Sequence, residues 1–412
     1  MPRTDATRAY VCGTFDTKGP ELRFLAARLR DAGVGVCLVD VSTRSHNEPV
    51  DVSAQAVAVH HPQGESAVLG LDDRGRAVAG MALAFERFIA TRNDIGGVIG
   101  AGGSGGTALI APGLRVLPVG LPKIIVSTIA SGNVAPYVGT SDIMLMPSVT
   151  DVQGINRISR QILGNAANAL AGMMLHESSG AVADGRPAIG LTMFGVTTPC
   201  VQQVCAMLER DYDCLVFHAV GTGGAAMEKL IDSHLLTGAI DVTTTEICDM
   251  MMSGIFPADE TRFDSIIRTR IPYVVSCGAL DMVNFAGMDT VPERYRTRNL
   301  YAHNPQVTLM RTTADECVRM AEWIAAKLNR MEGQVRLLLP ERGISALDVP
   351  GKPFYDPVAD AALFDTLEAR VIASADRKVI RLPYAVNDVE FATALVSAFQ
   401  DIAEVTHDGS TI

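Results

Sequence analysis

Short apolar runs alternate with amphipathic helical patterns along this chain of 412 residues. The run "VGVCLVDV" at 34–41 is almost continuously apolar, as expected of a parallel strand that is covered on both faces. It follows "GPELRFLAARLRDAG", in which Leu22, Leu25 and Leu29 share one helical face. Further strands are expected at 8–13, 95–100 and 123–128, and a helix at 77–92. This alternation predicts an α/β protein with a doubly wound sheet.

Two segments of the first half differ from this pattern. Residues 50–75 alternate in polarity and contain "DDRG", which predicts a β-hairpin. The stretch 151–176 has helical periodicity, and its expected buried stripe consists of Ile155, Ile158, Ile162, Ala166, Ala169 and Met173. The glycine- and serine-containing "ESSGAVADGRP" that follows is expected to be a hinge.

The second half of the chain repeats features of the first. "FHAVGTGGAAME" is similar to "VIGAGGSGGTAL", and "YVVSCGALDMVNFAGMDTV" is similar to "IIVSTIASGNVAPYVGTSDI". In the second pair a strand, a serine, small residues, a glycine and a late aspartate recur in the same order. We infer two Rossmann-like, doubly wound subdomains that arose by duplication, at 1–179 and 180–412.

Composition excludes several classes of protein. A formal charge of −11 and a sequence pI of about 5.2, without any basic run, argue against binding of nucleic acid. The start "MPRTDATRAYVCG" has no apolar leader, and the uncharged windows are rich in glycine or hydroxyl residues. The eight cysteines are scattered without CxxC spacing, which argues against a disulfide framework or a zinc site. We expect a cytoplasmic protein with no nucleic-acid or membrane partner.

The glycine-rich stretch "IGAGGSGGTAL" at 99–109 follows an expected strand. Ligands of open parallel sheets bind beyond the carboxyl ends of the strands, and glycine lets a backbone approach them closely. Gly100, Gly102 and Gly105 fit G-x-G-x-x-G, but the next strand ends in Ser127 and Thr128 and lacks the acidic residue of a dinucleotide site. A phosphate or nucleotide loop and a purely structural turn both remain open.

We expect a nucleotide at this edge, because the neighbouring strand ends are also rich in hydroxyl groups. Thr107 is the expected neighbour of a magnesium ion, whereas the ligands of the metal itself stay unknown. The residues expected to contact the nucleotide are Thr14, Asp16, Lys18, Gly102, Gly103, Ser104, Gly105, Gly106, Thr107, Ser127, Thr128, Ser131 and Asn133.

The second half has its own polar strand ends. Carboxylates there could transfer protons or hold a metal through water, and His303 with Arg311 could bind an acidic substrate. Helix caps and structural hydrogen bonds are the alternative for such residues. The candidate catalytic residues are Glu246, Asp281, Asn284, His303 and Arg311.

Several long motifs carry a resemblance to a known family. They include "GGSGGTALIAPGLRVLPVGLPKIIVSTIASGNVAPYVGTSDIMLMPSVTDVQGINRIS", "TMFGVTTPCV", "HNPQVTLMRTT" and "LDVPGKPFYDPVADAALF". The chain resembles an uncharacterised protein family typified by the amino-terminal ATP-binding domain of the tomato mosaic virus resistance protein. This resemblance implies two Rossmann-like subdomains, ATP binding and a homodimer.

Two classes of function follow as hypotheses. The chain is either a metabolic enzyme that uses ATP and a small acidic substrate in the cleft between its subdomains, or a nucleotide-gated regulatory module without turnover. The polar strand ends of the second half favour the enzyme. In a third alternative, one half has lost its ligand and only dimerises.

Overall fold

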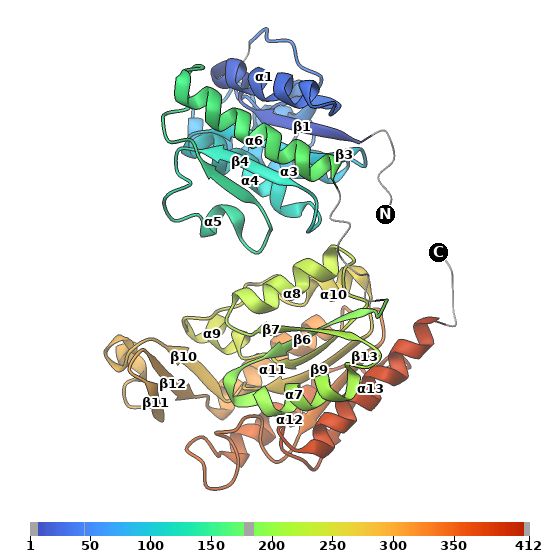
Figure 1. The fold of residues 1–412 in the computed structure, drawn as a ribbon. Coiled ribbons are helices and arrows are strands. Elements are labelled where there is room, and N and C mark those ends of the chain that lie inside the picture. Colours follow the sequence, from blue (N-terminus) through green and yellow to red (C-terminus); the bar gives the residue numbers. More distant parts are fainter. Residues whose placement is uncertain (1–6, 45, 177–184, 408–412) are drawn as a thin grey trace. The chain divides into compact units, whose positions relative to one another are not determined.

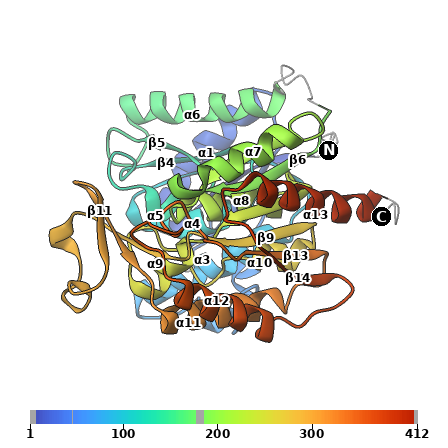
Figure 2. The same ribbon diagram turned by 90° about the horizontal axis from the view of Figure 1, so that it is seen from below.

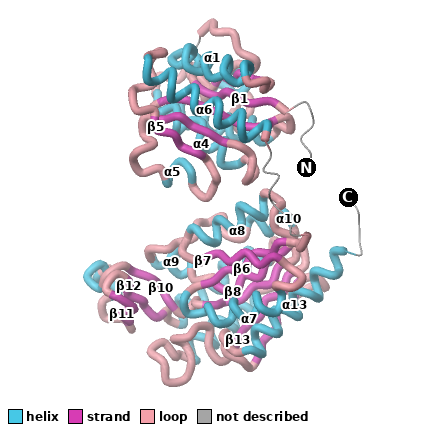
Figure 3. The backbone as a smooth tube through the Cα atoms, viewed as in Figure 1, coloured by secondary structure: helices cyan, strands magenta, loops and turns pink. Residues whose placement is uncertain are grey.

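The computed structural model describes residues 7–44, 46–176 and 185–407, with side chains up to residue 403. The chain divides into two compact units, Met1–Val182 and Ala183–Ile412, and Figures 1 and 3 show a sheet flanked by helices in each. Both main sheets are parallel throughout, so the predicted α/β class with doubly wound sheets is confirmed.

The sheet of the N-terminal unit has the order β2-β1-β3-β4-β5. Helices α1 and α6 cover one face, and α2, α3 and α4 cover the other. The strands are β1 (Arg8–Gly13), β2 (Val36–Asp40), β3 (Ile95–Gly102), β4 (Lys123–Ser127) and β5 (Met144–Pro147). The helices are α1 (Phe15–Asp31), α2 (Ala54–Ala58), α3 (Arg74–Ala90), α4 (Ser104–Val116), α5 (Ala135–Val138) and α6 (Arg157–Leu175).

The sheet of the C-terminal unit has the order β14-β13-β9-β8-β6-β7. Figure 2 shows α7 and α13 on one face and α11 and α12 on the other, with α8, α9 and α10 joining the second layer. The strands are β6 (Ala188–Met193), β7 (Asp213–His218), β8 (Gly238–Thr243), β9 (Tyr273–Gly278), β13 (Val335–Pro340) and β14 (Arg377–Leu382). The helices are α7 (Thr198–Leu208), α8 (Thr222–Asp232), α9 (Glu246–Met252), α10 (Asp264–Thr269), α11 (Ala314–Leu328), α12 (Pro357–Arg370) and α13 (Val389–His407).

A small antiparallel sheet is inserted between β9 and β13, in the order β10-β12-β11. Its strands are β10 (Met282–Phe285), β11 (Leu300–Asn304) and β12 (Val307–Arg311). The strands β10, β11 and β14 were not predicted from the sequence. These three strands are short or carry charge and aromatic rings, so their apolar signal is weak.

The predicted hairpin at 50–75 is wrong. This segment contains α2 and a short 3₁₀ turn at Glu65–Ala67, and only Val52 forms an isolated bridge, to Val39. The residues that suggested turns act as helix caps instead. Ser53 accepts a hydrogen bond from the Ala56 N–H, and Asp73, from "DDRG", accepts one from the Arg76 N–H.

The long helix is present as α6, but the predicted buried stripe is displaced. Its most buried residues are Ser159, Leu163, Ala166, Ala167, Leu170 and Ala171. Of the predicted stripe, Ala166 is buried and Ile158 is 39% exposed, whereas Ile155, Ile162, Ala169 and Met173 pack at the margin. Two apolar stripes overlap on this helix, and periodicity alone did not distinguish them. Most of the expected hinge, 177–184, lies outside the described residues.

The two sheets share one strand order. With β6, β7, β8, β9 and β13 counted as strands one to five, the C-terminal sheet has the N-terminal order 2-1-3-4-5, and β14 adds a sixth strand. This agreement supports the inferred duplication. However, the two glycine loops are not equivalent, because "GAGGSGGT" follows the third strand of its sheet and "VGTGG" follows the second.

Candidate nucleotide site

A pocket of about 310 Å³ lies at the carboxyl edge of the N-terminal sheet. Strand order reverses between β1 and β3, and open α/β sheets bind ligands where this reversal opens a crevice. The connections after β1, β2 and β3 all contribute to its wall. The pocket is lined by Thr14, Asp16, Thr17, Lys18, Thr43, Arg44, Arg74, Val78, Gly102, Gly103, Ser104, Gly105, Gly106, Leu109 and Asp151.

The glycine loop forms one wall of this pocket. Strand β3 ends at Gly102 and helix α4 begins at Ser104, without a side chain capping its N-terminus. Gly103, Gly105 and Gly106 have no positive φ, and a Cβ at any of them would meet no protein atom closer than 3.6 Å. The backbone therefore does not require glycine there. Missing side chains instead leave the first N–H groups of α4 open to an anionic ligand.

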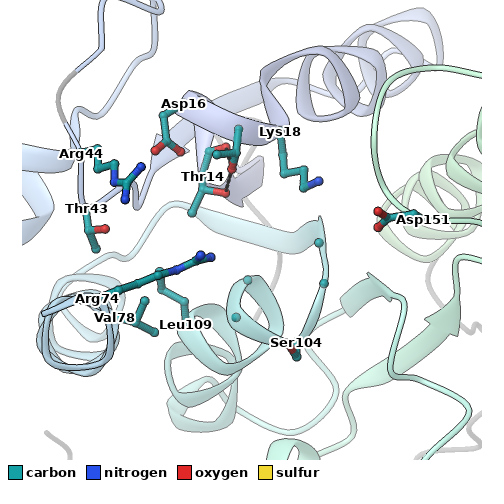
Figure 4. Close-up of a pocket in the computed structure, with 15 residues that line it drawn as sticks. Thr14, Asp16, Lys18, Thr43, Arg44, Arg74, Val78, Ser104, Leu109 and Asp151 are labelled. Atoms are coloured by element: carbon teal, nitrogen blue, oxygen red, sulfur yellow. Dashed lines mark hydrogen bonds between the residues drawn. The ribbon is translucent and has the colours of Figure 1, made fainter.

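Three cationic side chains reach toward the pocket from three different elements, as Figure 4 shows. Lys18 comes from α1, Arg44 from the connection after β2, and Arg74 from the first position of α3. The amine of Lys18 donates a hydrogen bond to the carbonyl of Val152. The carboxylates of Asp16 and Asp151 line the same pocket. With three cations and two carboxylates, the charged side chains of the pocket carry a net positive charge.

The sequence identified Lys18 but missed Arg44 and Arg74. Arg44 follows a strand that the sequence did predict, so its place at a carboxyl edge was a usable signal. The position of Arg74 at this pocket could not be predicted, because the segment before it was interpreted as a hairpin. The start of α3 reaches this pocket because the segment before it folds as α2 and a short turn, and not as a hairpin.

Hydrogen bonds hold the loop after β1 in place. Asp40 accepts from the Phe15 N–H (3.2 Å) and from the Ser42 hydroxyl (2.5 Å). The same hydroxyl lies 3.1 Å from Oδ1 of Asp16. Asp16 is thus held at the pocket by groups that are themselves bonded to the end of β2, which orients its carboxylate before any ligand binds.

Thr107 and Ser127 lie beneath the pocket and do not line it. Both are fully buried, and their hydroxyl oxygens are 2.6 Å apart. The Thr107 hydroxyl also lies 2.9 Å from the Gly103 carbonyl. These contacts join the glycine loop to the end of β4. Thr107 therefore supports the floor of the pocket, and its hydroxyl is engaged by contacts inside the protein.

The remaining predicted contacts are divided. Thr128 and Ser131 line an adjacent hollow of about 450 Å³, together with the loop 147–151, and Asp151 borders both hollows. Asn133 lines neither, because its Oδ1 accepts a hydrogen bond from the Ala135 N–H at the start of α5. Among the described residues, no cluster of three or more His, Cys, Asp or Glu side chains is placed to hold a metal ion.

The side chain of Glu246 is hydrogen-bonded to the backbone of the second glycine loop, "VGTGG". Its Oε1 accepts hydrogen bonds from the N–H groups of Gly221 (2.7 Å) and Gly224 (3.1 Å), and its Oε2 lies 3.2 Å from Nε of Arg262. Arg262 is buried and also pairs with Asp241 and Glu228. An internal carboxylate thus takes the backbone donors that a phosphate would need. The "VGTGG" loop is structural.

Asp281 and Arg311 belong to a second buried group of charges. The Arg311 guanidinium lies 3.2 Å from Asp348 and 2.7 Å from Asp360. Asp281 accepts a hydrogen bond from Ser345 (2.8 Å), and its other carboxylate oxygen has no partner. Burial raises the pKa of Asp281 to about 6 and that of Asp348 to about 9. Arg311 is 4% exposed and does not line the pocket that His303 borders.

Asn284 and His303 lie in different surroundings. Asn284 is buried in β10, where its backbone N–H donates to Asp249 at 2.7 Å. Burial raises the pKa of this aspartate to about 7. His303, in β11, borders a pocket of about 210 Å³ with His218 and Asn304, and most of its other lining residues are aromatic or aliphatic. Of the five catalytic candidates, only His303 lines a pocket described here.

Comparison with known proteins places the chain in a family. Residues 7–179 match the N-terminal domain and residues 186–403 the C-terminal domain of the uncharacterised protein family UPF0261. A UPF0261 protein of Mesorhizobium japonicum is 57% identical over 96% of this chain and 99% of its own length. The ToMV resistance protein Tm-1 of Solanum lycopersicum is 44% identical over 97% of this chain but only 56% of its own length. No helix in the described parts of the chain is long and apolar enough to cross a membrane. The chain belongs to the uncharacterised protein family UPF0261.

Proposed function

We propose that the N-terminal unit binds ATP, with its phosphates at the N-terminus of α4. The observation that carries this proposal is the combination of uncapped backbone N–H groups and three cationic side chains around one pocket. A helix N-terminus favours anions, and Lys or Arg adds charge that can neutralise phosphate oxygens. Within the part of the chain that the structure describes, no salt bridge involves Arg44 or Arg74.

ATP is the proposed nucleotide because the family resemblance implies it and because the pocket wall is not wholly polar. Val78 and Leu109 add apolar surface beside the glycine loop, which suits a base or a ribose face. Asp16 and Asp151 are carboxylates in the same pocket. Magnesium at phosphate sites is held by one or two carboxylates together with the phosphates and water, so these two residues fit a magnesium–ATP complex.

Gly103→Val tests the proposal directly. A Cβ at Gly103 would lie 3.6 Å from Oγ1 of Thr128, so the chain should accept valine while its methyl groups enter the space assigned to phosphate. We expect titration calorimetry to show ATP binding at least about tenfold weaker, a loss of about 1.4 kcal/mol. Gly164→Val is the matched control, because a Cβ at Gly164 in α6 meets nothing within 4 Å.

A charge variant separates phosphate binding from a change in loop shape. Arg74→Gln removes a cation from the pocket, whereas Arg76→Gln removes an exposed cation of the same helix that does not line it. Weaker ATP binding by Arg74→Gln alone supports the proposal. Unchanged affinity in both Gly103→Val and Arg74→Gln would overturn it.

A second candidate function rests on the pocket of about 210 Å³ in the C-terminal unit. His218 and His303 both line it, and Phe194, Val220 and Phe256 form apolar walls. Nδ1 of His218 lies 3.1 Å from the Met193 carbonyl, and this contact orients the His218 ring at the pocket wall. We propose that this pocket takes a small carboxylic acid with an apolar body, as the enzyme hypothesis requires.

His303→Asn, with His234→Asn as the control at an exposed histidine outside the pocket, tests this candidate. A panel of small carboxylic acids is screened by thermal shift, and ATP turnover is measured with each acid that binds. We expect His303→Asn alone to weaken binding about tenfold, as the loss of a charge-assisted hydrogen bond implies. If no acid stabilises the wild-type protein, the acid-binding candidate is rejected and the ATP-binding module remains.

A further inference from the structure

Two of the eight cysteines differ from the other six. Cys12, Cys37, Cys200, Cys248, Cys277 and Cys317 are buried, whereas Cys205 and Cys214 are partly exposed. Both line one open pocket of about 810 Å³. They come from different elements, since Cys205 lies in α7 and Cys214 in β7. The fold thus brings two accessible thiols to the same place on the surface of the C-terminal unit.

The contacts of the two thiols make them unequal. Both side chains also pack against the same hydrophobic core cluster, and they interact directly with each other. This interaction lowers the pKa of Cys205, since the Cys214 thiol stabilises its thiolate, and it raises the pKa of Cys214. An accessible cysteine of lowered pKa next to a second thiol is a common arrangement of an attacking and a resolving cysteine.

Access to the pair is open on the side of β7. Among the strands that the structure describes, β7 pairs only with β6 and is the edge of its sheet, where Cys214 lies opposite Ile189. Arg186 and Arg210 line the same pocket, and Val216 of β7 is 44% exposed. A small oxidant can therefore reach the sulfur atoms without the core opening.

We propose that Cys205 and Cys214 form a reversible disulfide and act as a peroxide-sensitive site on the C-terminal unit. The Cys205 thiolate attacks one oxygen of hydrogen peroxide, the O–O bond breaks, and hydroxide leaves and takes up a proton as water. This gives a sulfenic acid at Cys205. The sulfur of Cys214 then displaces the sulfenic hydroxyl as a second water and forms the S–S bond. Two thiols lose two electrons and two protons, and the peroxide is reduced to water.

The test is stoichiometric peroxide oxidation of the full chain, followed by alkylation under denaturing conditions and peptide mass spectrometry. The chain is digested with trypsin, which does not cleave the Arg186–Pro187 bond. We expect the peptide 161–210, which holds Cys200 and Cys205, to be linked to the peptide 211–229, which holds Cys214. Fragment ions between residues 201 and 204 distinguish Cys205 from Cys200. Treatment with dithiothreitol should restore both free thiols, and the five cysteines outside these two peptides should be alkylated throughout.

Single substitutions test the order of the steps. Cys214→Ser should leave a sulfenic acid at Cys205 that dimedone traps, whereas Cys205→Ser should leave Cys214 unmodified. Both positions are partly exposed, so serine is compatible with folding, and circular dichroism checks this. The proposal is overturned if wild-type protein keeps both thiols free under peroxide, or if Cys205 proceeds to sulfinic acid without the linked peptide.

Discussion

At the scale of single residues, two buried arginines of the C-terminal unit are each paired with several carboxylates. Arg262 is surrounded by Glu228, Asp241 and Glu246, and Arg311 by Asp348 and Asp360. Each guanidinium faces more than one carboxylate inside the C-terminal unit. Such groups contribute little net stability as a set, but removing one partner leaves unpaired charge in the interior. Glu246 was predicted as catalytic and is one of these structural charges.

The excess of carboxylates around Arg311 predicts a dependence of stability on pH. Burial beside Asp281 and Asp360 raises the pKa of Asp348 to about 9, well above that of an unfolded aspartate. The folded chain therefore keeps a proton that the unfolded chain releases. This contribution to stability is complete below about pH 4 and is lost as pH rises toward the folded pKa.

Asp348→Asn should make this dependence weaker, because asparagine cannot lose the proton. We expect the slope of unfolding free energy between pH 5 and pH 8 to be less negative than in the wild type, by up to about 1.4 kcal/mol per pH unit. Urea denaturation across this range measures it. Asp365→Asn, at an exposed aspartate of α12, is the control. Parallel slopes for Asp348→Asn and the wild type would contradict the assignment.

At the scale of elements, close packing of α4 positions the glycine loop. A Cβ at Gly113 would lie 2.5 Å from the ring of Phe85 in α3. A Cβ at Gly100 would meet the carbonyl of Cys12 at 2.8 Å, so β3 also approaches β1 closely. These glycines serve packing, in contrast to Gly103 and Gly105, which border the pocket. One glycine-rich stretch therefore has two roles, separated by a few residues.

Gly113→Ala should destabilise the chain by about 1–3 kcal/mol, as overpacking of a filled interior does. Gly172→Ala is the matched control, since a Cβ at Gly172 in α6 meets nothing within 4 Å. It should stabilise by about 0.5–1 kcal/mol through helix propensity. Urea denaturation measures the unfolding free energy of both variants. Equal changes would mean that α3 and α4 accommodate the added methyl group with no loss of stability.

At the scale of the whole molecule, two units with one strand order bear different pockets. The N-terminal pocket follows strands one, two and three of its sheet. The pocket that His218 and His303 line follows strands one and two of the C-terminal sheet, with Phe256 and residues of the inserted sheet added. In the C-terminal unit the loop after strand three is buried, with Thr244, Thr245 and Glu246 inside. The two sheets thus have the same strand order, but different side chains line the pockets at their carboxyl ends.

Much of the fold was predictable because strands and helices follow from local apolar periodicity. The sequence predicted β1, α1, β2, β3 and β4, and it located the glycine loop at a carboxyl edge. The prediction failed where one local sequence pattern is compatible with two different structures. Asp73 serves equally in a turn or as a helix cap, and α6 carries two apolar stripes.

The site was predictable only in part, for a physical reason. By itself the sequence determined the α/β alternation and the loop whose glycines leave backbone donors open, since both depend on residues close along the chain. Tertiary structure alone decided that Arg44 and Arg74 join Lys18, that Thr107 and Ser127 face each other below the pocket, and that Glu246 occupies the second glycine loop. Each of these contacts joins distant segments, and burial, which only packing creates, decides whether a polar side chain meets a ligand or another part of the chain.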